Sequence, residues 1–262
     1  MGHQIVTKYI SCGYNGKPVL TEISFTISGG ENVCILGPNG VGKTTLFKTM
    51  LGLLKPLGGE ISFNGRSRSE YSVREMAQTV AYVPQAHHPP FPYTALEVVT
   101  LGRTAYMGLF ATPRKEDVRI AQEMMEMLGI EHLRNSVFTQ MSGGEKQMVL
   151  IARALAQKPS FLIMDEPTSN LDFGNQAEVL SCINQLVENG LGVLMTTHNP
   201  DHAFLSATQV LLLFPDKTYK IGSCQDVLTP ENMRIAYGIE TSVGTLSTLD
   251  GRKVITCAPV LN

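Results

Sequence analysis

The chain has 262 residues, with 21 lysines and arginines against 23 aspartates and glutamates, which gives a formal net charge of −2. Hydrophobic residues make up 43% of it. This share is enough to fill a sizeable core, and it excludes a wholly disordered chain. The nearly neutral charge argues against a dedicated nucleic-acid binder, because such proteins carry a basic face.

The apolar runs are too short for a membrane span, which needs roughly 18 or more consecutive apolar residues. Residues 210–214 are apolar but end at Pro215, and the run at 149–156 is interrupted by Arg153. The N-terminus has no apolar signal segment. We therefore expect a cytoplasmic protein whose connection to a membrane, if it has one, is made through a partner.

The five cysteines are scattered, odd in number and never at metal-ligand spacing. We interpret them as small buried hydrophobes rather than as a disulfide framework or a zinc site. They are Cys12, Cys34, Cys182, Cys224 and Cys257.

The first part of the chain predicts strands followed by a glycine loop and a helix. Residues 5–11 and 19–28 have the pattern of strands, and residues 32–36 form a short apolar run typical of a buried strand. A glycine-rich turn at 37–42 and a helix at 43–54 come next. Strand, glycine loop and helix are the opening of an α/β unit.

The next part predicts two strands and then a mostly helical segment. Strands are expected at 60–63 and 80–83, and Ser72 with Glu75 predicts a capping box that begins a short helix. Residues 85–159 contain helical patterns at 95–101, 116–128 and 145–156. The middle helix places apolar side chains at helical spacing, which we interpret as packing: Val118, Ala121, Met124, Met125 and Leu128.

The α/β pattern then resumes. Strands are expected at 161–164, 192–197, 209–214 and 219–221, and a helix at 176–187. The tail at 240–260 has the pattern of a small β-rich extension, with a turn at Asp250-Gly251.

Residues 37–44 read Gly-Pro-Asn-Gly-Val-Gly-Lys-Thr and fit the phosphate-loop template in full. The loop lies between a predicted buried strand and a helix, as its chemistry requires. Glycines let successive backbone N–H groups converge on phosphate oxygens at the helix N-terminus. Lys43 is expected to reach the β- and γ-phosphates, and Thr44 to give a hydroxyl to Mg²⁺. The alternative is a glycine turn that only caps a helix, and the surrounding pattern disfavours it.

Residues 161–166 form an apolar strand that ends in two carboxylates, Asp165 and Glu166. Alone, this pattern indicates a strand that meets solvent. Together with a phosphate loop it predicts that Asp165 holds Mg²⁺ through water and that Glu166 orients and deprotonates an attacking water.

Residues 142–147 read Ser-Gly-Gly-Glu-Lys-Gln and predict a second capping box, formed by Ser142 and Glu145. Two glycines in a first turn cost helix stability. They offer exposed N–H groups at a helix N-terminus, which is a second potential anion site.

With these motifs in order along nearly the whole length, the chain resembles the nucleotide-binding subunits of ATP-binding cassette (ABC) transporters. The family signature Leu-Ser-Gly-Gly-Gln reads Met-Ser-Gly-Gly-Glu at 141–145. The resemblance implies an α/β fold with a RecA-like P-loop NTPase core, an N-terminal antiparallel β part and a helical subdomain. Glu145 in place of Gln puts a direct polar contact from this side chain to nucleotide in doubt, but not the roles of Ser142 and Gly144.

The resemblance also implies the remaining site residues. The residues that it implies for catalysis are Glu166, Gln85 of the glutamine loop and the switch histidine His198. The residues that it implies for Mg²⁺ binding are Thr44, Gln85 and, through water, Asp165. The residues that it implies for ATP binding are Tyr14, Gly37, Asn39, Gly40, Gly42, Lys43, Thr44, Thr45, Ser142, Gly143, Gly144 and Asp172.

Taken without the resemblance, His198 and His202 are an i, i+4 pair that raises the question of a metal site. Pro200 between them and the strand before them weaken that interpretation. Tyr14 lies where the family stacks an aromatic ring on adenine, and the alternative is a loop tyrosine packed on the sheet. The loop at 169–172 resembles the one that crosses to the partner subunit in the family. Asn170 is a departure from the family's usual Ala in that loop.

The family's architecture implies a core at 1–84 and 160–239, a helical signature subdomain at 85–159 and a C-terminal extension at 240–262. Two copies arranged head to tail would each place Ser142 and Gly144 against ATP bound by the other. The expected partners are therefore a second copy, integral-membrane permease subunits and, indirectly, a substrate-binding protein, with no nucleic acid. This places the chain at the cytoplasmic face of the membrane, held there by the permease.

Three segments are similar to the iron–siderophore, haem and vitamin B12 importers: 93–108, 165–172 with Gln176, and 237–260. Three alternatives stay open: an ATPase for another solute such as zinc or manganese, a cassette ATPase without a transport role, and a phosphoryl-transfer kinase. Residues 89–93 suit a groove that receives a helix of the permease, or else form a proline-stiffened loop.

Overall fold

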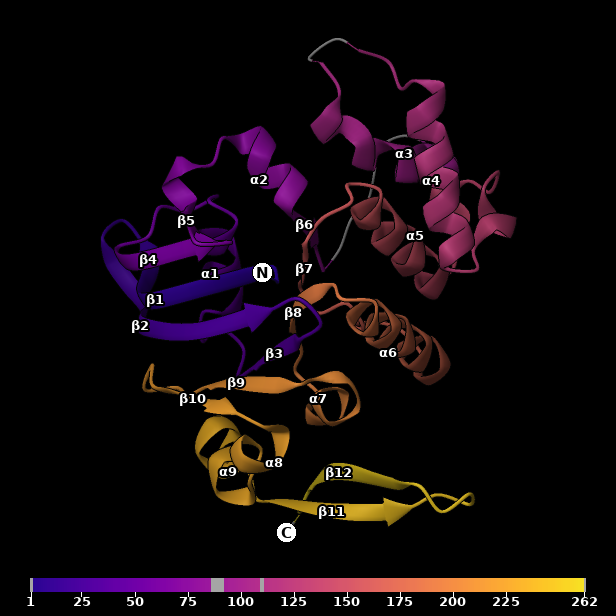
Figure 1. The fold of residues 1–262 in the computed structure, drawn as a ribbon. Helices are drawn as coiled ribbons and strands as arrows, with labels where there is room; N and C mark the ends of the chain where they lie inside the picture. Colours follow the sequence, from indigo (N-terminus) through magenta and orange to yellow (C-terminus); the bar gives the residue numbers. More distant parts are fainter. Residues whose placement is uncertain (1, 86–91, 109–110, 262) are drawn as a thin grey trace. The chain divides into compact units, whose positions relative to one another are not determined.

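The computed structural model describes residues 2–85, 92–108 and 111–261 (Figure 1). The chain forms two compact units. Unit 1 comprises residues 1–70 and 187–262, and unit 2 comprises residues 71–186. The loop expected at residues 89–93 lies largely outside the described residues.

Unit 1 begins with an antiparallel sheet in the order β2-β1-β4-β5. β1 and β2 form a hairpin whose turn residues, Asn15 and Gly16, both have positive φ, at 51° and 75°. This is the backbone that favours a two-residue turn between twisted strands. The apolar side chains that alternate along β2, Ile23, Phe25 and Ile27, are all buried. The bounds are β1 Gln4–Tyr14, β2 Lys17–Ser28, β4 Gly58–Phe63 and β5 Arg66–Ser67, followed by the 3₁₀ turn η1 at Arg68–Glu70.

The same unit contains parallel strands in which every residue of β3 and β8 is buried. β3 lies between β8 and β9 and is parallel to both, and β10 pairs antiparallel with β9. Continuous apolar runs are typical of parallel strands that are covered on both faces. The bounds are β3 Asn32–Leu36, β8 Gly192–Thr196, β9 Gln209–Leu213 and β10 Tyr219–Gly222.

The helix α1 (Lys43–Met50) is shorter than the expected 43–54. It is followed by Gly52, whose φ is 76°, and the guanidinium of Arg68 occupies the space where a Cβ of residue 52 would lie. A left-handed residue ends a helix, and at this position only glycine leaves room for the arginine.

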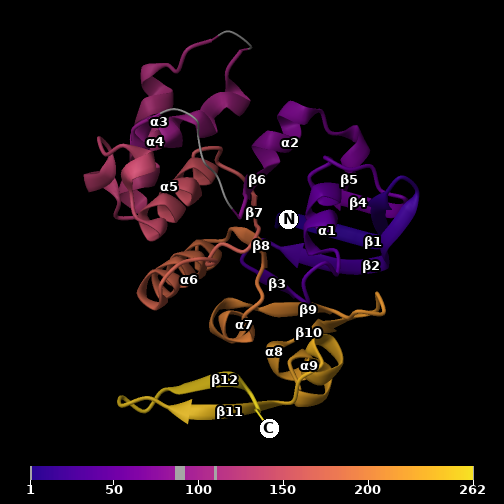
Figure 2. The ribbon, with the colours of Figure 1, turned by 180° about the vertical axis from the view of Figure 1, so that it is seen from behind.

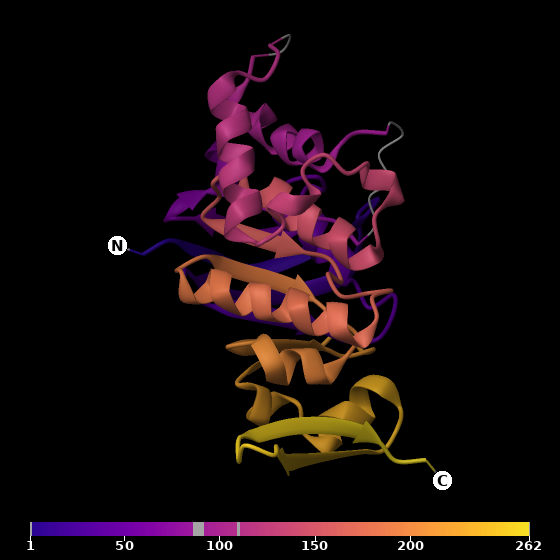
Figure 3. The ribbon, with the colours of Figure 1, turned by 90° about the vertical axis from the view of Figure 1, so that its right-hand side faces the viewer.

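The C-terminal part of unit 1 is a hairpin preceded by two short helices that the sequence pattern did not predict. α8 and α9 lie between β10 and the hairpin in the views of Figures 1 and 2. Figure 3 shows the two strands of the hairpin side by side, which confirms the expected β-rich tail and its turn at Asp250-Gly251. The bounds are α7 Pro200–Ser206, α8 Cys224–Val227, α9 Pro230–Tyr237, β11 Thr241–Ser247 and β12 Lys253–Pro259.

Unit 2 is mostly helical and contains the strand pair β6 and β7, which are parallel. Capping boxes begin α2, α3 and α5, and those at Ser72 and Ser142 confirm the sequence prediction. The bounds are α2 Val73–Thr79, β6 Val80–Val83, α3 Ala95–Thr100, η2 Leu101–Tyr106, α4 Lys115–Met127, η3 Glu131–Leu133, η4 Phe138–Gln140, α5 Gly143–Leu155, β7 Phe161–Met164 and α6 Phe173–Glu188.

A buried ion pair joins the helices of unit 2. Arg103 Nε lies 3.2 Å from Asp117 Oδ1, and Arg103 Nη1 donates a hydrogen bond to the carbonyl of Ala156 at 2.7 Å. The expected apolar stripe of α4 is only partly right: Met125 is buried, whereas Met124 is half-buried. Within the described residues, no helix has the length and apolar character that crossing a membrane requires.

Candidate nucleotide site

The phosphate loop follows β3 and is shaped by glycines with positive φ. Gly37 has a φ of 147°, and a Cβ there would lie 2.7 Å from the carbonyl oxygen of Leu213. Gly42 has a φ of 119°, and a Cβ there would lie 2.8 Å from Leu20 Cγ. Both positions therefore exclude a larger residue. Gly42 is also the N-cap of α1, and no side chain caps this helix. A helix N-terminus of this kind favours phosphate oxygens.

Lys43 is buried and folded back into the loop. Its Nζ donates hydrogen bonds to the carbonyl of Gly37 at 2.6 Å and to that of Pro38 at 3.2 Å. A bound phosphate would meet this ammonium at the helix N-terminus. Thr44, next in the chain, is exposed, whereas Thr45 is buried in the packing of the helix.

Tyr237 is a contact of the loop that sequence reasoning missed. Its hydroxyl accepts a hydrogen bond from the backbone N–H of Gly37 at 3.1 Å. Burial raises the pKa of Tyr237 to about 12, so the phenol stays protonated at neutral pH. Nothing in the motif points to a residue 200 positions away along the chain.

Two more predicted residues lie in unit 1. Tyr14 is at the end of β1 with 45% of its surface exposed, in keeping with a ring available for stacking. His198 is exposed and follows Thr197, whose backbone N–H donates to the carbonyl of Ile35 at 3.2 Å. This bond ties the loop with His198 to β3, the strand that leads into the phosphate loop.

Unit 2 brings Gln85 and Glu166 together, because β6 and β7 are parallel neighbours that end at the same edge. Gln85 Nε2 donates to Glu166 Oε2 at 2.9 Å. Asp165 is buried, and its backbone N–H donates to the carbonyl of Val83 at 2.9 Å. Glu166 has a φ of 48°, a left-handed backbone that is costly for a residue with a side chain. Such positions gather at functional sites.

The N-terminus of α5 carries the signature residues. Ser142 Oγ donates to Glu145 Oε2 at 2.8 Å, and the backbone N–H of Glu145 donates back to Ser142 Oγ at 3.3 Å. The hydroxyl of Ser142, and then its backbone N–H, donate to the Glu145 carboxylate and hold the pKa of Glu145 below its ordinary value. Glu145 is therefore a carboxylate that accepts a hydrogen bond from the signature serine within the same chain.

Asn175 links the signature to Asp172, and this residue too was missed. It donates to Asp172 through its backbone N–H at 2.9 Å and through Nδ2 at 2.7 Å. A Cβ at Gly144 would lie 2.2 Å from Asn175 Oδ1, so the side chain packs directly on this glycine. The absence of a side chain at the second signature glycine thus leaves room for Asn175.

The structure does not support a metal pair at His198 and His202. Both ring nitrogens of His202 lie within hydrogen-bond distance of neighbours, Thr197 and Asn199. Over the described ranges, no group of three or more His, Cys, Asp or Glu side chains could hold a metal ion.

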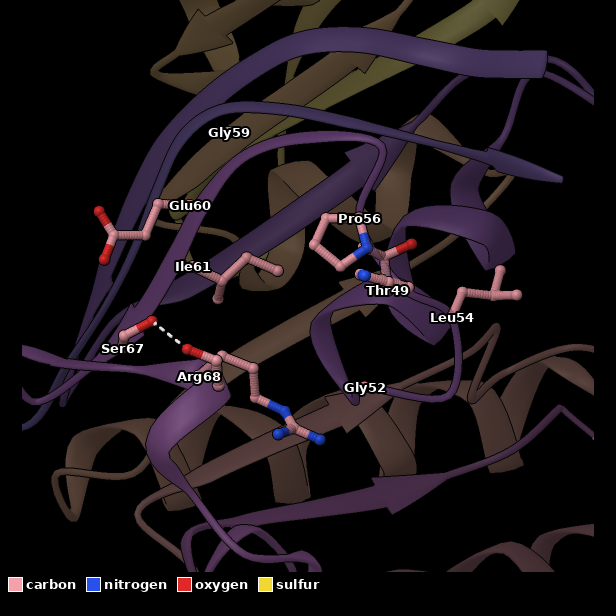
Figure 4. A pocket seen from close by; sticks show the side chains of 11 residues that line it. Thr49, Gly52, Leu54, Pro56, Gly59, Glu60, Ile61, Ser67 and Arg68 are labelled. Carbon is pink, nitrogen blue, oxygen red and sulfur yellow. Dashed lines mark hydrogen bonds between the residues drawn. The ribbon is translucent and has the colours of Figure 1, made fainter. Parts of the chain in front are cut away.

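A pocket of about 410 Å³ in unit 1 involves none of the predicted nucleotide contacts (Figure 4). Arg68 extends under Gly52 at its wall, and Arg68 Nη2 donates to the carbonyl of Leu51 at 3.3 Å. Lys55 and Glu60 also line it, so its charges are of both signs. We interpret Arg68 as a structural side chain that fills the space beside Gly52.

Comparisons with known proteins identify the family of the chain. The family described as ABC transporter matches residues 20–169. An uncharacterised ABC transporter ATP-binding protein of Haemophilus influenzae is 44% identical over 88% of each chain. The molybdate import ATP-binding protein MolC of the same organism is 35% identical over 81% of this chain and 79% of that protein.

Among solved structures, an ABC transporter in an inward-facing conformation, described as of the metal-chelate type, superposes with a TM-score of 0.88. It is 29% identical, and the match covers 99% of this chain and 98% of that one. Other relatives, 34% and 35% identical, are named for hemin import and manganese transport. The family match, these relatives and the phosphate loop agree: the chain belongs to the ATP-binding subunits of ABC transporters and is an ATPase with their fold.

Proposed function

We propose that the chain is the ATP-hydrolysing subunit of an importer and that the imported solute is a metal chelate, such as an iron–siderophore, haem or cobalamin. The observation that carries the proposal is the likeness, over 99% of the chain, to a transporter described as of the metal-chelate type. The relatives named for iron chelatin transport and hemin import, 35% and 34% identical, support it.

Residues of unit 1 would bind the phosphates and the adenine of ATP. Lys43 would exchange its loop carbonyls for the β- and γ-phosphates, and the uncapped N-terminus of α1 would receive the same oxygens. Tyr14 would stack on adenine, and Asn39, Gly40 and the buried Thr45 would complete the predicted ATP contacts.

The hydrolytic half falls to Glu166, which would accept a proton from the attacking water. Gln85 would hold the carboxylate of Glu166 in place through the 2.9 Å hydrogen bond. His198 would contact the γ-phosphate. The hydroxyl of Thr44, the amide oxygen of Gln85 and, through water, the carboxylate of Asp165 are oxygen donors that suit Mg²⁺. When bound, Mg²⁺ would neutralise charge on the phosphates.

We further propose that two copies associate head to tail on ATP. Ser142, Gly143 and Gly144 of one copy, with Asp172, would then contact the nucleotide of the other. Ser142 is exposed at the start of an α-helix, which is where an anion is favoured. Membrane permease subunits would hold the dimer at the cytoplasmic face. The core at 1–84 and 160–239, the helical subdomain at 85–159 and the extension at 240–262 remain our proposed division.

The test is co-purification with the permease encoded beside this chain, followed by ATPase assays in liposomes. A ferric siderophore, haem and cobalamin are compared with molybdate, Mn²⁺ and Zn²⁺, each with its candidate binding protein. Stimulation by one of the chelates alone supports the proposal. Stimulation by molybdate or a free metal ion refutes the chelate and leaves the ATPase assignment intact.

A second candidate, import of a different solute, is favoured by one observation. The relative named for molybdate import has nearly the same identity as those named for iron chelatin and hemin. The same assay separates the two candidates.

A further inference from the structure

A buried imidazole lies one helical turn after the switch histidine. His202, on α7, is only 6% exposed, whereas His198 is exposed. The chemistry proposed above gives His202 no role. A buried histidine requires hydrogen-bond partners for its ring nitrogens, because an unsatisfied polar group in the interior is costly.

Those partners are the two residues on either side of His198. His202 Nδ1 lies 3.2 Å from Thr197 Oγ1, and His202 Nε2 lies 3.2 Å from Asn199 Nδ2. The backbone N–H of Asn199 also donates to Thr197 Oγ1 at 3.1 Å. The three residues therefore form a closed ring of hydrogen bonds that brackets His198 in the sequence.

The ring fixes the tautomer of His202. Asn199 Oδ1 accepts from the backbone N–H of Asp201 at 3.0 Å, so the Nδ2 end of the amide must face the imidazole. Nδ2 can only donate, and Nε2 of His202 is therefore the acceptor and carries no proton. Nδ1 then carries the proton and donates it to Thr197 Oγ1. A doubly protonated ring would place N–H against N–H at Asn199.

The surroundings of the ring agree with a neutral imidazole. Burial, and next the charge of nearby His198, lower the pKa of His202, and Asp201 opposes them. Asp201 itself faces the C-terminal hairpin: its Oδ1 accepts from the backbone N–H of Cys257 at 2.8 Å and from Thr256 Oγ1 at 3.2 Å. Thr197 is held to β3 through the carbonyl of Ile35. The ring is thus fixed from both sides.

We propose that His202 is a positioning residue that holds the backbone on both sides of His198 and so aims the switch imidazole at the γ-phosphate. The proposal rests on the catalytic role proposed for His198. The phenyl ring of phenylalanine, which has no nitrogen, would occupy the space but leave Thr197 Oγ1 and Asn199 Nδ2 without this partner, and the loop would lose its defined geometry.

The test is a double-mutant cycle on ATP hydrolysis by the full chain, with His202→Phe, His198→Ala and the double variant. His202→Phe is expected to lower kcat by about tenfold or more, because small misplacements of a catalytic group are expensive, with KM for ATP and ATP binding nearly unchanged. In the His198→Ala background the same change is expected to have no further effect on kcat. Ser206→Ala is the matched control. Its hydroxyl contacts the carbonyl of His202 but not the ring, and kcat should stay at the native value.

The cycle separates the two ways of failing. If His202→Phe lowers kcat by the same factor with and without His198, the residue acts on overall stability and the positioning role is wrong. If His198→Ala alone leaves kcat unchanged, the role proposed for His198 is wrong, and the positioning role that rests on it is wrong too.

A second measurement does not depend on any variant folding. Long-range ¹H–¹⁵N correlation spectra of the native chain report which ring nitrogen carries the proton. We expect His202 as the Nδ1–H tautomer, with an unprotonated Nε2, at pH 7. An Nε2–H tautomer or a charged ring would overturn the hydrogen-bond ring on which the proposal stands.

Discussion

The side-chain amide of Gln85 donates a hydrogen bond to the carboxylate of Glu166 over 2.9 Å. Gln85 follows β6 and Glu166 follows β7, and the register pairs Val83 with Met164 two positions before each. The parallel pairing therefore delivers the two side chains to the same place. A carboxylate that accepts a hydrogen bond from an amide is held in one orientation, which a general base requires.

Replacing Glu166 with Gln should stop turnover while keeping the shape of the site. Gln cannot accept a proton from water, so we expect kcat to fall by about a hundredfold or more. ATP should still bind, and size-exclusion chromatography with ATP should show a stabilised dimer. Normal phosphate release from this variant would rule out Glu166 as the base.

Lys43→Ala should lose the ammonium that the phosphate loop holds between its own carbonyls. A charge-assisted contact to phosphate is lost, so the Kd for ATP should rise by about tenfold or more in a titration with a fluorescent analogue. Lys48→Ala, at an exposed position on the same helix, is the matched control and should bind ATP as the native chain does. Equal affinity of all three proteins would contradict the phosphate-loop assignment.

Ser142→Arg tests the head-to-tail arrangement. A bulky cation at the start of α5 should block the contact with ATP on a second copy, and turnover should fall by about a hundredfold. Nucleotide binding by the monomer should stay nearly native, because the loop that binds it lies in the same chain's unit 1. A parallel loss of monomer binding would show that Ser142 acts in its own chain.

Asp117→Asn should make the free energy of unfolding less dependent on pH in the acid range. The backbone N–H of Arg114 and then the contact with Arg103 hold the pKa of Asp117 below its ordinary value. The folded state therefore gains stability above the unfolded pKa, near 4, and loses it as pH falls through the lower, folded pKa.

At pH 7 the variant leaves the guanidinium of Arg103 buried without its carboxylate, so urea unfolding should show a loss of about 3 kcal/mol. The difference in the free energy of unfolding between the variant and the native chain should become smaller below pH 4. Glu116→Gln, which affects an exposed pair with Arg119 on the same helix, should leave the free energy of unfolding nearly unchanged. If the difference in the free energy of unfolding between Asp117→Asn and the native chain does not change with pH, the charge of Asp117 is not what stabilises the fold.

Local sequence patterns predicted most of the helices and strands, and for several strands they predicted both the first and the last residue. The strands at 32–36, 80–83 and 161–164 have the predicted bounds, because short apolar runs between turn residues leave little freedom. α8 and α9 were missed, although Ser223 and Thr229 cap them and Pro230 begins α9, because each is too short for an apolar period to show.

The contacts that the sequence did not predict depend on how side chains and elements pack. Tyr237 meets Gly37 from the other end of the chain, and the tautomer of His202 depends on how Asn199 caps α7. Asn175 is close to Asp172 in sequence, yet its contact with Gly144 arises only from the packing of α5 near the start of α6. No spacing rule encodes such contacts, since they depend on how elements pack.

The bonds from Asn175 to Asp172, together with its packing on Gly144, have a mechanical consequence for a working dimer. In the head-to-tail dimer proposed above, the signature and the loop at 169–172 would both face the neighbouring copy, and these contacts would join them. Neither would then engage or release alone. Separation of the dimer should therefore be all-or-none at each nucleotide, and a loosened Asn175 should uncouple hydrolysis from opening.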